Sequence, residues 1–70
     1  MTVVKVIELV GSSDKGWQEA VESAIKRASK TVRNIVGVDV IGCTGMVEEG
    51  KIVKYRANVK MSFIVEEVSG

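Results

Sequence analysis

Histidine is absent from this 70-residue chain, and cysteine occurs once, as Cys43. A single cysteine excludes an internal disulfide, and a lone cysteine without histidine does not make a zinc site. Without histidine there is also no usual base to activate Cys43 as a nucleophile, so we interpret it as a small strand residue. No paired carboxylates occur at a recognisable spacing. We therefore predict that the protein is not an enzyme.

The chain has few aromatic residues, no long apolar run and no excess of one charge. Its core must be aliphatic, since only one Trp, one Tyr and one Phe are present. No apolar run approaches the ~18 residues of a membrane-spanning helix, and the N-terminus lacks the build of a signal peptide. The net charge of +1 argues against a nucleic-acid binder, whose basic face normally dominates the sum. We expect no membrane or nucleic-acid partner, and the unpaired cysteine fits a cytoplasmic location.

The segment from Ile52 to Val68 alternates between apolar and polar residues, which indicates a long strand with one buried face. About 14 residues of strand span ~46 Å, whereas a globule of this size has a radius of gyration of only ~11 Å. The strand is therefore too long to be covered by its own subunit. Either it bends sharply around a helix or its ends pair with other copies. A chain this small is commonly stabilised by oligomerisation. The apolar positions are Val53, Tyr55, Ala57, Val59, Met61, Phe63 and Val65.

A helix is predicted from Asp14 to Arg33, because apolar residues recur there at helical spacing in a single stripe. Ser13 is the expected N-cap. A first strand, Val3–Val10, is apolar on both faces and predicted to be covered on most sides. The Gly11–Ser13 segment is expected to break it.

A second strand is predicted from Ile35 to Cys43, with Gly37 and Gly42 marking a bend, a bulge or a close approach. The segment 44–50 is expected to be irregular and to end in a turn at Glu48–Gly50. The predicted order is thus β-α-β-β in one domain, residues 1–70. We expect an α+β fold, with a three-stranded antiparallel sheet wrapped around the helix and the long strand in the middle.

Three segments together resemble the dodecins, and the resemblance covers nearly the whole chain. They are residues 5–13 (KVIELVGSS), residues 24–28 (AIKRA) followed by Thr31-Val32, and residues 55–63 (YRANVKMSF). The resemblance implies a hollow, roughly spherical homododecamer of cubic symmetry. It also implies non-catalytic binding and storage of small molecules, typically flavins of the FMN or riboflavin type stacked at subunit contacts. Some bacterial members also hold coenzyme A, and others are calcium-binding dodecins.

The sequence departs from the flavin-binding pattern at two positions. Family members carry a tryptophan early in the second strand that stacks on the flavin, and Gly37 stands at that position. They carry a glutamine after the tyrosine of the long strand, and Arg56 stands there. Losing the stacking ring removes ~1–3 kcal/mol per contact, and an arginine only donates hydrogen bonds. Flavin binding is expected to be weak or altered. The positions that match the family's flavin site are Gly37, Val38, Asp39 and Arg56.

Several interpretations remain open at this point. Arg56 either pairs with Asp39, or with a glutamate of another copy, or forms a site for an anionic ligand. Gly37 is either a packing glycine or a vacated ligand slot. Trp17 is interpreted as a core anchor at the base of the helix. A calcium or other divalent cation site at Glu48-Glu49 would need acids from neighbouring subunits.

Overall fold

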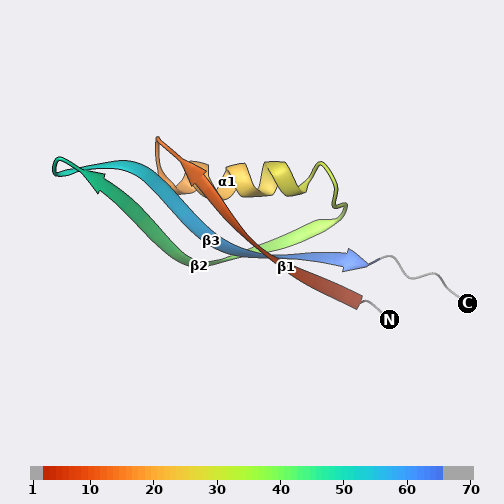
Figure 1. The fold of residues 1–70 in the computed structure, drawn as a ribbon. Coiled ribbons are helices and arrows are strands. Elements are labelled where there is room, and N and C mark those ends of the chain that lie inside the picture. The colour runs from red at the N-terminus through yellow and green to blue at the C-terminus, as the bar shows by residue number, and fades with distance from the viewer. Residues whose placement is uncertain (1–2, 66–70) are drawn as a thin grey trace, which may run out of the picture.

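The computed structural model describes residues 3–65, which form one sheet and one helix (Figure 1). The elements are β1 (Val3–Ser13), α1 (Trp17–Ala28), β2 (Ile35–Glu48) and β3 (Lys51–Val65). The strands pair antiparallel in the order β1-β3-β2, so the long strand β3 lies in the middle. The predicted element order and topology are confirmed. Within residues 3–65, no helix has the length and apolar character that crossing a membrane requires.

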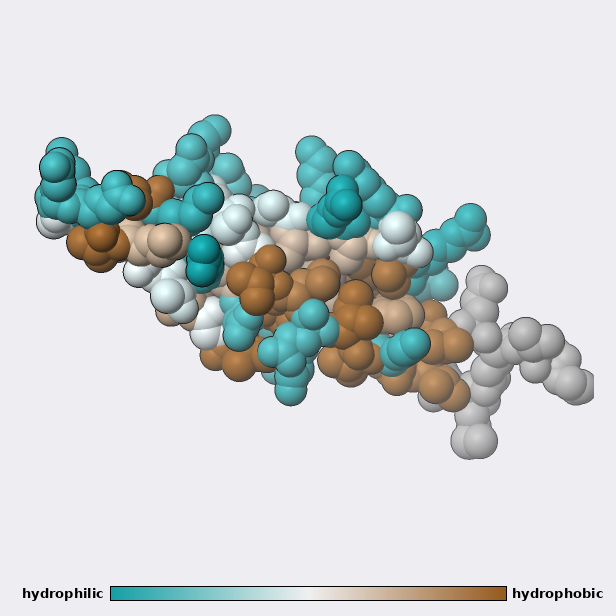
Figure 2. All heavy atoms as spheres, viewed as in Figure 1, coloured by the Kyte–Doolittle hydropathy of each residue, from teal (hydrophilic) through white to brown (hydrophobic). Residues whose placement is uncertain are grey.

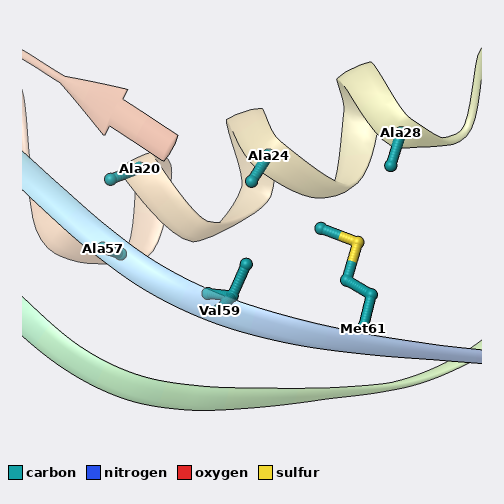
Figure 3. Close-up of a cluster of buried hydrophobic side chains, with 6 residues drawn as sticks. All are labelled: Ala20, Ala24, Ala28, Ala57, Val59 and Met61. Carbon is teal, nitrogen blue, oxygen red and sulfur yellow. The ribbon is translucent and has the colours of Figure 1, made fainter. Parts of the chain in front are cut away.

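The core is a thin layer between α1 and β3 (Figure 3). Helical spacing places three alanines on one face of α1, and strand alternation turns every second residue of β3 toward them. The largest fully buried side chains are Met61 and Val59. Because alanine is small, the helix lies close to the sheet but buries little apolar area. Within residues 3–65, the buried hydrophobic residues of this layer are Ala20, Ala24, Ala28, Ala57, Val59 and Met61.

Gly11 lies where α1 approaches β1 most closely. The predicted strand break at this residue is wrong, because β1 continues through Gly11 to Ser13. A methyl group placed on Gly11 would clash with the Ala20 carbonyl oxygen and lie 3.0 Å from Ala24 Cβ. The missing side chain thus permits close packing of a strand against a helix.

The helix is shorter at both ends than predicted. Gly16 is the N-cap, and Ser13 is buried in β1, where its Oγ accepts a hydrogen bond from the Lys15 N–H at 2.9 Å. At the other end, the Ser29 hydroxyl donates to the Ile25 carbonyl at 2.8 Å. Hydroxyl side chains that bond to backbone carbonyls compete with helical geometry, and α1 ends at Ala28 rather than at Arg33.

β2 extends beyond its predicted end at Cys43 and pairs with β3 as far as Glu48. The segment 44–48 is therefore a paired strand and not the irregular loop that was predicted. Register shifts occur between Ile35 and Gly37 and between Val40 and Gly42, so the predicted irregularities at the two glycines are confirmed as bulges.

The turn predicted at Glu48–Gly50 is confirmed as a two-residue hairpin connection. Glu49 and Gly50 have φ of 52° and 77°, and two successive positive φ values are typical of the tight turns that join twisted strands. The strand that follows was predicted to reach Val68. β3 ends at Val65, and residues 66–68 lie outside the described part of the chain.

The subunit is elongated, at 59 × 20 × 12 Å with a radius of gyration of 14.8 Å, against ~11 Å for a compact globule of this length. The prediction that one subunit cannot cover its long strand is therefore confirmed. We predicted that β1 is covered on most sides, and for a single copy this is wrong. More than half of the surface of each of Val3, Val6 and Val10 is exposed. Figure 2 shows hydrophilic side chains along the helix and apolar ones on the sheet beneath it.

We predict that Gly11→Ala destabilises the fold, because the added methyl group meets backbone that cannot move aside. Overpacking of this kind typically costs about 1–3 kcal/mol. Gly42→Ala is the matched control, since nothing lies within 4 Å of its added methyl group. Urea unfolding followed by circular dichroism measures both. Equal midpoints for the two variants would contradict the close approach at Gly11.

Candidate functional site

The candidate site lies on the face of the sheet turned away from α1, which we call the outer face. Ala57, Val59 and Met61 point toward the helix (Figure 3). Because side chains alternate along a strand, the residues between them point the other way, and their cross-strand partners share that face. From β3 the outer face receives Arg56, Asn58, Lys60 and Ser62.

Three of the four predicted site residues gather at one hollow of the sheet, which we call the Gly37 hollow. It is an open depression of ≈ 280 Å³. Gly37 pairs with Ser62, and Asp39 pairs with Lys60. A methyl group on Gly37 would lie 2.9 Å from Ser62 Oγ. The lining residues are Val6, Gly37, Val38, Asp39, Lys60 and Ser62.

Arg56 lies apart from these residues, at a second depression that we call the Arg56 hollow. It measures ≈ 220 Å³. Arg56 pairs with Thr44 on β2 and with Ser12 on β1, so hydroxyl side chains flank the guanidinium on both neighbouring strands. Planar donors beside hydroxyls suit a phosphate or carboxylate. The lining residues are Val10, Gly42, Cys43, Thr44, Arg56 and Asn58.

One copy of the chain therefore does not bring the four predicted site residues together. Arg56 lies four residues along β3 from Lys60, which corresponds to ~13 Å. The cross-strand partner of Asp39 is Lys60, not Arg56. The register therefore does not favour an Arg56–Asp39 pair within one subunit.

A row of charges crosses the outer face and was missed by the sequence analysis. Lys60 of β3 stands between Glu8 of β1 and Asp39 of β2 as the register partner of both. Opposite charges at such positions attract one another across the strands. The signal could not be found in the sequence, because it depends on the register of three strands that are far apart in the chain. Asp39 and Lys60 of this row also line the Gly37 hollow.

Trp17 lies at the base of the helix as predicted, but outside the buried core. It is 38% exposed. Its ring meets that of Tyr55 edge to face, with centroids 4.7 Å apart at 84°, and its Nε1–H donates to the Thr44 carbonyl at 3.3 Å. The indole thus connects the start of α1 to both strands of the β2–β3 hairpin through these two contacts. It lines neither hollow.

We predict that Trp17→Ala lowers the stability by about 1–2 kcal/mol, since it removes both the ring contact and the hydrogen bond. Trp17→Phe keeps a ring against Tyr55 and should lose only about 0.5–1 kcal/mol. Urea midpoints measured by circular dichroism give the order. If Trp17→Ala left the midpoint unchanged, the contacts of Trp17 with Tyr55 and Thr44 would not stabilise the fold as predicted.

Comparison with known proteins gives one consistent result. Residues 3–66 match the model of the Dodecin family. The chain is 34% identical over 65 residues to a dodecin of Thermus thermophilus, covering 93% of this chain and 94% of that protein. It is 33% identical over 63 residues to a calcium dodecin of Mycobacterium tuberculosis, covering 90% and 89%. A solved structure of a dodecin from Streptomyces coelicolor superposes with a TM-score of 0.89 at 33% identity, covering 94% of each chain.

Proposed function

This chain belongs to the dodecin family, and on that basis we propose that it forms a hollow, roughly spherical homododecamer that binds and stores small molecules without catalysis. The observation that carries the proposal is the uncovered apolar surface of the elongated subunit. Among residues 3–65, fifteen large apolar residues are exposed, including Val10 and Val47 at 63% each. Contiguous apolar surface of this kind marks an interface, and further copies of the chain are the proposed cover.

The ligand that we propose is a small molecule at the subunit contacts, held in a remodelled flavin pocket. The Gly37 hollow lacks a stacking ring, while the Arg56 hollow offers a guanidinium between Ser12 and Thr44. A flavin of the FMN or riboflavin type is then held weakly or in an altered way. Donors at Arg56 favour an anionic group on the ligand. Gly37, Val38, Asp39 and Arg56 remain the proposed contacts, with Arg56 supplied by a neighbouring copy.

The second candidate is an assembly that binds calcium, or has a purely structural role, without a flavin. The relative named calcium dodecin motivates it. Among residues 3–65, no group of three or more His, Cys, Asp or Glu side chains could hold a metal ion. Since Ca²⁺ takes six to eight oxygen ligands, a site made of these residues must combine carboxylates of several copies.

We place the protein in the cytoplasm, because the exposed thiol of Cys43 suits a reducing compartment. The proposed partners are other copies of the chain and the small ligand. Nucleic acid and membranes are not among them, since the net charge of +1 gives no dominant basic face.

Native mass spectrometry of the protein as purified tests the proposal. We expect a mass of twelve subunits, with increments that match a flavin, a nucleotide or calcium. Increments of a flavin or nucleotide support the storage function, and calcium alone or a bare twelve-subunit mass supports the second candidate. A monomer or dimer would contradict the assembly on which both candidates depend.

If Gly37 is a vacated ligand slot, a tryptophan placed there should supply the stacking ring that the pocket lacks. Gly37→Trp with Arg56→Gln should tighten flavin binding at least ~10-fold, the equivalent of one good contact. Ser62→Ala is added because its Oγ lies 2.9 Å from the new Cβ. Quenching of flavin fluorescence on titration measures the affinity.

The control for this experiment is Arg56→Gln with Ser62→Ala, which changes the same pocket but adds no ring. The control should bind no more tightly than the unaltered protein. If the triple variant folds and assembles but matches this control, Gly37 is a packing glycine and the slot interpretation is wrong.

A further inference from the structure

The β2–β3 hairpin projects beyond the rest of the subunit as an arm, residues 46–53 (Figure 1). Trp17 of α1 marks the base of the arm, where its Nε1–H donates a hydrogen bond to the Thr44 carbonyl. Beyond it the arm exposes apolar side chains: Met46 (40%), Val47 (63%), Ile52 (41%) and Val53 (39%). A two-stranded hairpin alone is marginally stable in water, so this arm requires cover from elsewhere.

A groove that is also mainly apolar lies at the other end of the helix, between α1 and β1. We call it the β1–α1 groove, and its volume is ≈ 400 Å³. Its walls are mainly apolar, and Arg27 and Lys30 add positive charge. The surrounding sequence has no acidic residue between Glu22 and Asp39, so nothing on this segment neutralises them. The lining residues are Ile7, Leu9, Arg27, Ala28, Lys30, Thr31 and Val32.

The tip of the arm complements the charge of the groove. The turn brings Glu48 and Glu49 to the end of the hairpin. Lys51 is the ladder partner of Glu48, whereas Glu49 is a turn residue and has no cross-strand partner. The arm therefore presents apolar flanks with a carboxylate at the apex, and the groove presents apolar walls beside two cations.

The arm and the groove of one subunit cannot meet. The arm begins beside the first residue of α1, the groove lies at its last turn, and a helix of this length separates them by ~18 Å. The arm also points away from the groove (Figure 1). We propose that the arm of one subunit seats in the β1–α1 groove of the next, with Glu49 beside Arg27 and Lys30. A head-to-tail contact of this kind forms a ring when its rotation closes, and a shell of cubic symmetry contains three-membered rings. The inference rests on the proposed assembly and names its contact surface.

A charge exchange tests the contact in the full chain. Arg27→Glu and Glu49→Lys should each shift native mass spectra toward smaller species, because like charges then meet in the contact. Combining the two substitutions should restore the assembly. Lys26→Glu is the matched control: it reverses the neighbouring charge on α1 but lies outside the groove, and we expect the assembly to be unchanged. Circular dichroism checks that each variant is folded.

Zero-length carbodiimide coupling tests the same contact in the unaltered protein. It joins a carboxylate and an amine that touch, with loss of water. A mixture assembled from ¹⁴N and ¹⁵N subunits should give a mixed-isotope peptide that joins Glu49 to Lys30. Coupling of Lys30 to Glu66 or Glu67 instead would identify a different occupant of the groove and overturn the proposal.

The outcomes separate this proposal from the proposed function. A twelve-subunit protein that neither reversal affects, and that gives no Glu49–Lys30 peptide, keeps the assembly and overturns the arm-in-groove contact. A three-subunit ring with the charge-exchange pattern supports the contact and contradicts the shell of twelve. Failure of the combined variant to restore the assembly also counts against the contact.

Discussion

The close packing of α1 on the sheet is the constraint on which the rest of the structure depends. Gly11 has no side chain where the helix crosses β1, and the atoms of the helix nearest to it are the Ala20 backbone carbonyl and the Ala24 methyl group. This brings the helix near the sheet and fixes which face of every strand is buried. The outer face is then defined by alternation, which directs Arg56, Asn58, Lys60 and Ser62 of β3 there.

The same packing leaves the subunit incomplete. A layer of alanines buries little apolar area, and α1 is much shorter than the strands that it covers. Both ends of the sheet therefore remain exposed, as do the valines of β1 and the hairpin arm. Chains of this size are commonly stabilised by oligomerisation. The shape of the subunit, together with its family, is the reason that we propose assembly.

The predicted ligand-binding residues of the outer face lie in two separate hollows. The Gly37 hollow offers space where the family resemblance implies a stacking ring, and the Arg56 hollow offers donors where it implies an amide. Two residues of the charge row of Glu8, Lys60 and Asp39 line the Gly37 hollow, and none lines the Arg56 hollow. Since one copy does not unite the hollows, the ligand is expected at a contact between copies, and its identity depends on how two outer faces meet.

The sequence alone determined the element order, the middle position of β3, the buried face and the hairpin turn, because alternation, helical spacing and turn residues are local signals. It also identified Gly37 and Arg56 as the positions that differ from the flavin-binding pattern. It misjudged Gly11, since a glycine that ends a strand and one that admits a helix look alike until the helix is placed. Only the tertiary structure decided the strand register, and with it the Lys60 charge row and the separation of Arg56 from Asp39. Register depends on contacts between distant segments, and no local pattern in this chain encodes it.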